Sequence, residues 1–370
     1  LDDAKGIVEG LRRMTVPGRQ DMNRRSLLTG TAAAASAAAL PNRFAVAQSA
    51  QNRVLKMVPQ ANLTSLDPIW TTANITRNHG HMVFDSLYGL DAEFRPHPQM
   101  AEGHVLDDGG RTVTITLRPG LKFHDGEPVR AQDVVPSVTR WMRRNPFGQK
   151  LATVTDAVEV VDDRRLRFRL KRPFPLIFKA LAQVSNSPCF IMPERLARTD
   201  PFQQVREAIG SGPFRFKASE YNSGSMVVYE KNPDYVPVSS GTTSLTAGPK
   251  VAHFDRVEWH IIVDAATAAA ALQTGEIDWY EQPPPEIQQL LRRNRNVVVE
   301  SIDPLPLTGI LRFNHLHPPF NDKKMRQAIL PAIGQEDFMQ AIVGTEPELY
   351  RTGIGMFTPG TPLANDAGLA

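Results

Sequence analysis

The segment 111–117 alternates strictly between threonine and aliphatic residues, and Pro119-Gly120 follows it. One face carries Val113, Ile115 and Leu117, and the other carries Thr112, Thr114 and Thr116. A period of two predicts a half-buried β-strand that ends at the Pro-Gly turn. The 30 prolines in 370 residues argue against a helical bundle and for many loops and edge turns.

Strands and helices are mixed along the rest of the chain. Further strands are predicted at 53–59, 158–170 (a pair broken at Asp162-Asp163), 213–216 with 226–230 (a hairpin), 257–263, 297–302 and 310–314. Helices are predicted at 75–90, 131–142, 265–274 and 322–333, and a loop at 236–250. The order lacks strict βαβ alternation and shows no repeat of fixed period, so the sequence predicts a mixed α/β fold.

Charge and cysteine content exclude several protein classes. Residues 1–47 hold seven of the 42 basic and four of the 39 acidic residues, so the chain from residue 48 onward is neutral. The pI near 9.0 therefore gives little support to nucleic-acid binding, which needs a basic body or stripe. The 41% hydrophobic and 22% charged content is that of a globular protein. The length of 370 residues suggests about two or three domains. The single cysteine, Cys189, excludes an intrachain disulfide framework and a cysteine-based metal centre.

The N-terminal segment 1–47 has the pattern of an export signal. Arg24-Arg25 precede an uncharged, alanine-rich stretch from Leu27 to Leu40, and Ala45-Val46-Ala47 follows. The stretch is too short to span a bilayer, and the small residues have the spacing that a signal peptidase recognises. The segment resembles a twin-arginine (Tat) signal peptide, with Met22 as the expected start and a mature chain from about Gln48. The alternative, an amphipathic alanine-rich helix, would need a charged face that this stretch lacks.

Catalytic and cofactor signals are weak. The chain has no nucleotide-binding glycine motif, no H-E-x-x-H and no G-x-S-x-G. Cys189 lies in an apolar context, which favours a small buried residue over a nucleophile. The pairs His79/His81 and His315/His317 could ligate a metal from a strand, but the first falls in a predicted helix, where i and i+2 diverge, and the second in a proline-rich turn. The sequence therefore predicts no enzyme, no metal site and no cofactor.

Several segments, taken in order, resemble the family 5 extracellular solute-binding proteins of ABC transporters, the dipeptide, oligopeptide and nickel-binding group. They are S-L-D-P at 65–68, F-D-S-L-Y at 84–88, L-R-P-G-L-K-F-H-D-G-E-P-V-R-A-Q-D-V at 117–134, G-S-G-P-F at 210–214, E-K-N-P-D-Y at 230–235, A-L-Q-T-G-E-I-D at 271–278 and F-N-H-L-H-P-P-F-N-D-K-K-M-R-Q-A-I at 313–329. Each motif also has a scaffold explanation as a turn, a cap or a buried aromatic, which we prefer to ligand contact.

The resemblance implies an α/β, two-lobed periplasmic binding protein fold (type II, cluster C-like) with an extra inserted subdomain. Lobe I is expected from 48–90 and 205–300, the inserted subdomain at 91–204, and the start of lobe II at 301–370. Members of the family run longer than this chain, so we expect lobe II to be incomplete. The carboxylate that pairs with the peptide α-amino group in peptide-binding members would then lie beyond Ala370.

The resemblance also implies where a ligand lies, between the two lobes. The expected ligand-binding residues are Trp70, Thr71, Thr72, Asn74, Trp279, Thr308, Arg312 and Asn314. Alternatives remain for three of them. Trp70 fits a core aromatic, Arg312 fits a surface charge, and Trp279 with Tyr280 fits packing at a hinge.

The expected function is capture of a small ligand in the periplasm, most naturally a di- or oligopeptide or a peptide-like solute, and its delivery to an ABC permease of the inner membrane. The protein is expected to be a monomer, without catalysis and without nucleic-acid partners. An exported enzyme such as a hydrolase and a metal-chelate-binding member of the same family are the alternatives. Peptide, opine, sugar and metal-chelate ligands stay open.

Overall fold

The computed structural model describes residues 53–184, 187–302, 308–367 and 369. The predicted export signal lies outside the described residues. No helix in the described part of the chain has the length and apolar content needed to cross a membrane.

The strands are β1 (Val54–Val58), β2 (Asp85–Ser86), β3 (Tyr88–Leu90), β4 (Pro96–Pro98), β5 (Ala101–Asp107), β6 (Thr112–Leu117), β7 (Thr155–Val160), β8 (Arg165–Leu170), β9 (Phe190–Ile191), β10 (Phe214–Phe216), β11 (Met226–Lys231), β12 (Arg256–His260) and β13 (Trp279–Tyr280). The α-helices are α2 (Asn74–Val83), α3 (Ala131–Arg144), α4 (Pro146–Val154), α5 (Ile177–Leu181), α6 (Glu194–Ala197), α7 (Ala265–Thr274), α8 (Pro285–Arg292), α9 (Lys323–Ile329) and α10 (Gln335–Val343). Short 3-10 turns are η1 (Asp108–Gly110), η2 (Ala218–Glu220) and η3 (Leu330–Ala332).

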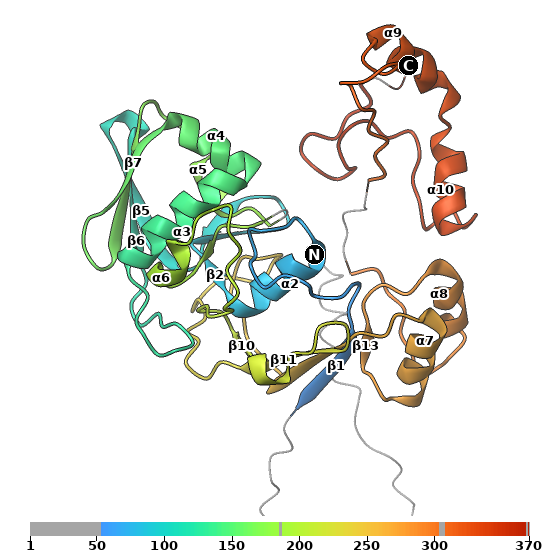
Figure 1. Cartoon of the computed structure of the whole chain (residues 1–370), viewed down its shortest axis with the longest axis horizontal. Helices are drawn as coiled ribbons and strands as arrows, with labels where there is room; N and C mark the ends of the chain where they lie inside the picture. Colours follow the sequence, from blue (N-terminus) through green and yellow to red (C-terminus); the bar gives the residue numbers. More distant parts are fainter. Residues whose placement is uncertain (1–52, 185–186, 303–307, 368, 370) are drawn as a thin grey trace, which may run out of the picture. The chain divides into compact units, whose positions relative to one another are not determined.

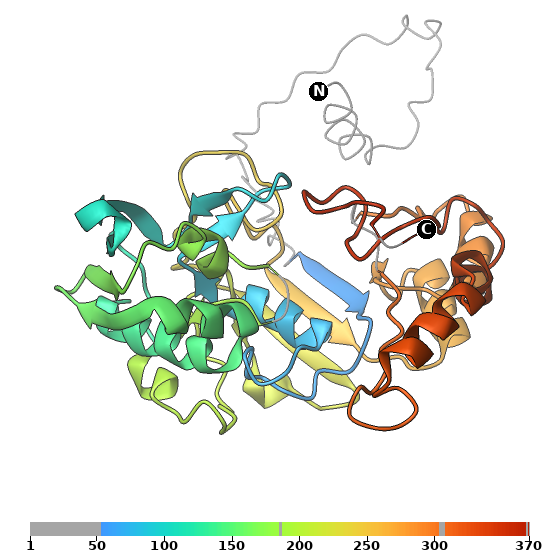
Figure 2. The same cartoon turned by 90° about the horizontal axis from the view of Figure 1, so that it is seen from above.

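A five-stranded sheet has the strand order β10-β11-β12-β1-β13 (Figure 1). The strand β1 runs parallel to both of its neighbours, whereas β10, β11 and β12 pair antiparallel. One face packs against α2 (Figure 2) and buries Met57, Phe214, Tyr229 and Trp259 in a common cluster with Val83. Alternation within each strand sends every second side chain to this face, as a period of two requires.

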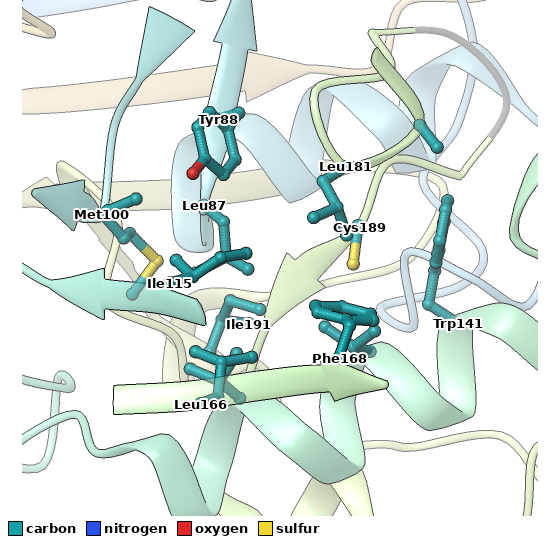
Figure 3. Packing of buried hydrophobic residues seen from close by; sticks show 14 of the residues in the cluster. Leu87, Tyr88, Met100, Ile115, Trp141, Leu166, Phe168, Leu181, Cys189 and Ile191 are labelled. Atoms are coloured by element: carbon teal, nitrogen blue, oxygen red, sulfur yellow. The ribbon is translucent and has the colours of Figure 1, made fainter. Parts of the chain in front are cut away.

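A four-stranded antiparallel sheet has the order β5-β6-β8-β7. The aliphatic face predicted for β6 is buried, and it meets the alternating residues of β8 in register, with Val113 opposite Phe168 and Ile115 opposite Leu166. Figure 3 shows Ile115, Leu166 and Phe168 in one cluster with Trp141 of α3 and Cys189. Cys189 is a buried core residue, as predicted, and burial raises the pKa of its thiol, so it is poorly suited to act as a nucleophile.

Several of the sequence motifs lie in contact with one another at one place in the fold. We call this place the junction and define it as residues 83–86, 124, 210–213, 232–235 and 250. The His124 imidazole contacts the Gly212 carbonyl at 3.1 Å, and the Gly212 amide donates to the Val83 carbonyl at 2.9 Å. A Cβ on Gly210 would lie 2.1 Å from the Val83 oxygen, so only glycine permits this approach. Burial lowers the pKa of His124 to about 4, which favours its neutral form.

A carboxylate is buried on the same junction. The Tyr235 hydroxyl donates to one Asp85 carboxylate oxygen at 3.0 Å, and the Lys250 ammonium contacts the other at 2.6 Å. Because Asp85 is only 1% exposed, it depends on these partners. The motifs at 84–88, 123–126, 210–214 and 230–235 thus contact one another, which agrees with the scaffold explanation preferred from the sequence.

Several predicted elements differ from the structure. The helix predicted at 75–90 ends at Val83, because Asp85–Ser86 pairs with β9 as β2. The strands predicted at 297–302 and 310–314 do not form in the described residues. Ile302, Ile310 and Leu311 are each more than half exposed, so their apolar runs lack the covered face that a strand needs. The division into lobe I, an inserted subdomain and an incomplete lobe II stays a prediction.

Candidate ligand-binding site

The parallel part of the five-stranded sheet defines one edge where side chains can meet a ligand. The chain leaves β1 at Pro59-Gln60, leaves β12 at Ile261 and leaves β13 at Glu281, all at the carboxyl ends of strands that run in one direction. In open α/β sheets, ligands bind outside the carboxyl ends of parallel strands. This edge, together with α2, is therefore the candidate site.

A buried ion pair anchors the segment after S-L-D-P. Asp67 is fully buried, and its carboxylate contacts the Arg140 guanidinium of α3 at 2.6 Å. The same carboxylate accepts the backbone amides of Ile69 and Val205. A buried carboxylate needs such partners to offset its lost hydration, so Asp67 fixes the path of the chain leading to Trp70.

Four of the predicted ligand-binding residues follow Asp67 in one stretch. Trp70 is 36% exposed, and the Arg144 guanidinium lies 5.1 Å from its ring centroid. Trp70 is therefore not the core aromatic of the alternative interpretation, although a cation already covers part of it. The Thr71 hydroxyl accepts the Ala73 amide and forms the turn into α2, Thr72 is exposed, and Asn74 begins the helix.

Trp279 lies in β13 at an edge of the five-stranded sheet and is 39% exposed. It pairs in register with Met57, whose side chain belongs to the face covered by α2, while Tyr280 pairs with Val58 and packs toward α7. Alternation therefore places Trp279 on the α2 face and Tyr280 on the opposite face. Of the two aromatics, Tyr280 packs against the fold and Trp279 stays accessible.

Glu281 shares the face of Trp279, and the sequence did not single it out. Its carboxylate accepts the Gln60 backbone amide at 2.9 Å and the Asn78 side-chain amide of α2 at 3.1 Å, while its own amide donates to the Val58 carbonyl. These bonds join the ends of β1 and β13 to α2. The sequence did contain one signal for Glu281, its position two residues after Trp279, which was an expected ligand-binding residue. Residues i and i+2 share a face of an extended chain.

Thr308, Arg312 and Asn314 lie in an irregular segment. The Thr308 hydroxyl contacts the Thr358 hydroxyl at 2.9 Å, and the Asn314 side chain accepts the Leu316 amide. Arg312 is exposed and has no ion-pair partner among the described residues, which fits the surface-charge alternative. In the described part of the chain, no hydrogen bond or ring contact joins these three residues to the stretch 70–74 or to Trp279.

In the described residues, no group of three or more histidine, cysteine, aspartate or glutamate side chains is placed to hold a metal ion. His79 is buried in α2 and contacts the Tyr229 hydroxyl at 2.9 Å, and burial lowers its pKa to about 3. His81 stacks edge-on against Phe190. Both histidines of this pair therefore serve packing.

Comparison with known proteins agrees with the motifs. Residues 95–367 match the family model described as bacterial extracellular solute-binding proteins, family 5 middle. The chain belongs to this family. A relative from Sinorhizobium fredii, named probable peptide ABC transporter periplasmic-binding protein, is 35% identical over 348 residues, which is 93% of this chain and 64% of the relative. The glutathione-binding protein GsiB of Pectobacterium atrosepticum is 29% identical over 75% of this chain and 51% of its own length. This family 5 chain thus spans about half to two thirds of the curated relatives it matches.

Solved structures give the same fold. The dipeptide-binding protein of Pseudoalteromonas sp. SM9913, solved with Met-Leu, has a TM-score of 0.62 at 23% identity, over 78% of this chain and 59% of that protein. The binding protein MoaA of Agrobacterium tumefaciens R10, solved with mannopinic acid, has a TM-score of 0.62 at 25% identity, over 79% and 57%. The expected periplasmic binding protein fold of this family 5 chain is therefore confirmed.

Proposed function

We propose that this protein is the solute-binding component of an ABC importer and that it captures a di- or oligopeptide, or a peptide-like solute, outside the cytoplasm. The observation that carries the proposal is the match to the family 5 binding proteins over residues 95–367. The name of the Sinorhizobium relative, a probable peptide transporter component, favours peptides over the sugar, opine and metal-chelate alternatives.

The candidate site supports binding without chemistry. It offers an accessible indole, at Trp279, and polar groups at the carboxyl edge of a parallel sheet. Such a mixture of aromatic surface and few oriented polar groups is typical of small-ligand sites. We propose that Trp279 and the stretch Trp70 to Asn74 contact the ligand, with Thr308, Arg312 and Asn314 contributing from their separate segment. Family membership favours this function over the exported hydrolase, and we propose no catalytic residue and no cofactor.

Ligand binding can be tested by thermal unfolding of the full-length protein against panels of dipeptides, tripeptides, opines and metal chelates. A ligand at a hundredfold excess over its dissociation constant adds roughly 2.7 kcal/mol to the free energy of unfolding. A shift with peptides alone supports the proposal, and Trp279→Ala should reduce it. A shift only with opines or chelates would replace the peptide assignment, and turnover of any panel member would replace the binding function.

We propose further that the protein acts as a monomer in the periplasm, delivers its ligand to an inner-membrane permease and is exported by the twin-arginine route. The paired Arg24-Arg25 and the Ala45-Val46-Ala47 segment support the export route. Replacing both arginines with lysine should leave an uncleaved precursor inside the cell. Full processing of the double variant would instead indicate Sec export.

A further inference from the structure

We propose that Glu281 selects a positively charged nitrogen on the ligand. This inference rests on the proposed function, because it names a specificity group of the same site. The starting observation is that, among the described residues, the Glu281 carboxylate is held by two neutral donors, the Gln60 amide and the Asn78 side chain, and by no cation.

The charge of Glu281 is uncompensated in the described residues. No lysine, arginine or histidine there lies within ion-pair distance of it. An ionised carboxylate can accept about four hydrogen bonds, and two are used here. The remaining acceptor capacity is available to a ligand, and a cationic donor would make the stronger, charge-assisted bond.

Position and support distinguish Glu281 from an ordinary surface acid. It is half-buried and follows β13, and its amide continues the ladder to the Val58 carbonyl. Its two neutral partners come from the end of β1 and from α2, so two separate elements fix its carboxylate. A side chain fixed in this way loses little conformational entropy on binding, which favours recognition.

Trp279 adds a second preference for a cation. It lies two residues before Glu281 on the same face and is 39% exposed. Successive residues on one face of an extended chain are about 6.6 Å apart. A carboxylate beside an accessible indole suits an ammonium or guanidinium group, since the ring face attracts a cation and the carboxylate accepts its hydrogen bonds.

The positive group could be the terminal amine of a peptide or a lysine or arginine side chain, and the experiment separates the two. Binding of the full-length protein is measured calorimetrically with matched peptides that differ in one charge. One arm compares free with acetylated amino termini. The other compares lysine with norleucine and arginine with citrulline.

We expect the wild-type protein to prefer the charged member of at least one arm by about tenfold or more. Glu281→Gln should reduce that preference to about twofold or less and keep binding of the neutral member, which also shows that the variant folds. Glu276→Gln is the matched control, because it removes an exposed carboxylate from the same segment without changing this face.

Each outcome bears on the proposal. A preference that survives in Glu281→Gln, or that is lost equally in Glu276→Gln, overturns the role of Glu281. Equal wild-type affinity for charged and neutral peptides also overturns it, while the proposed peptide-binding function stands. Failure of every peptide to bind the wild-type protein overturns the proposed function itself, together with this inference.

Discussion

Phe168 in the four-stranded sheet has no exposed surface, whereas Phe338 in α10 is 53% exposed. The difference extends to their surroundings. The sheet β5-β6-β8-β7 and helix α3 share one continuous cluster of buried apolar side chains, while α9, η3 and α10 contain no buried residue. The segment 308–367 nevertheless forms the helices α9 and α10 where its sequence is amphipathic. Local pattern is therefore sufficient for a helix in this protein, but burial depends on a partner surface.

The largest expected effect on stability comes from truncating one phenylalanine to alanine in each of the two regions. Phe168→Ala should lower the free energy of unfolding by about 4 kcal/mol, because it removes a buried ring and leaves a cavity. Phe338→Ala should change it by less than about 0.5 kcal/mol. Urea unfolding followed by circular dichroism measures both. Similar losses would mean that α10 belongs to the same cooperative unit as the sheet.

A buried and an exposed ion pair extend the comparison from apolar side chains to charged ones. Asp67 contacts Arg140 at 2.6 Å with both side chains almost fully buried, and Asp162 contacts Arg165 at the same distance with both about half exposed. Asp67→Asn should cost about 3 kcal/mol, since it leaves a guanidinium buried without its counter-charge. Asp162→Asn should cost far less, because water screens the pair.

The result for Asp67 can be checked by replacing both partners. The double variant Asp67→Leu with Arg140→Met should be more stable than the sum of the single changes predicts, because no unpaired charge is left buried. Simple additivity in urea unfolding would argue that the ion pair makes no specific contribution. The same pair supports the stretch that begins with Trp70, so ligand affinity should fall in Asp67→Asn as well.

The third expected effect is a pH dependence that arises in the packed region. Burial lowers the pKa of His79 to about 3, against about 6.5 in the unfolded chain. Below pH 6.5 the unfolded chain therefore binds a proton that the folded protein excludes. The stability that His79 contributes is fully present above pH 6.5 and is lost as the pH falls toward 3, at about 1.4 kcal/mol per pH unit.

Unfolding by urea at pH 7, 6 and 5 measures this dependence. His79→Gln should flatten the slope between pH 6 and pH 5 by roughly one proton, even though it also loses the contact with the Tyr229 hydroxyl. His317→Gln is the matched control, because it replaces a histidine in the exposed segment. Equal slopes in His79→Gln and the wild type would show that another group controls acid unfolding.

Sequence reasoning worked best where local pattern and burial agree. The alternation at 111–117 predicted β6, the hairpin predicted at 213–216 with 226–230 forms as β10 and β11, and the helix predicted at 265–274 forms as α7, which ends at Gly275 in a left-handed conformation. Fold class followed from motifs that the structure shows in contact with one another. These motifs report on the scaffold, and for that reason they could not identify the ligand.

Sequence reasoning failed where contacts between residues distant in the chain determine the local structure. The short strand β2 forms only because Asp85–Ser86 meets Phe190–Ile191, more than 100 residues away, so a helix was predicted through it. Glu281 was missed because its role depends on Asn78 and Gln60, which are distant in sequence. The local signal, a carboxylate two residues after Trp279, could not show these long-range contacts, whereas the position of Trp279 could be estimated from its own neighbourhood.

The smallest expected effect compares two helix caps of the same chemistry. Asp264 caps α7 by accepting the Thr267 amide at 2.7 Å, and Asp322 caps α9 by accepting the Lys324 amide at 2.8 Å. Helix α7 buries three alanines against the sheet, whereas α9 buries none. Loss of a cap destabilises the global fold only if its helix unfolds together with the core. Asp264→Ala should therefore lower the melting temperature by about 2 °C, and Asp322→Ala should leave it unchanged. Hydrogen exchange supplies the complementary measurement, since Asp322→Ala should still speed exchange of the α9 amides. An equal drop in melting temperature for both variants would place α9 within the cooperative core and remove the contrast between the two regions.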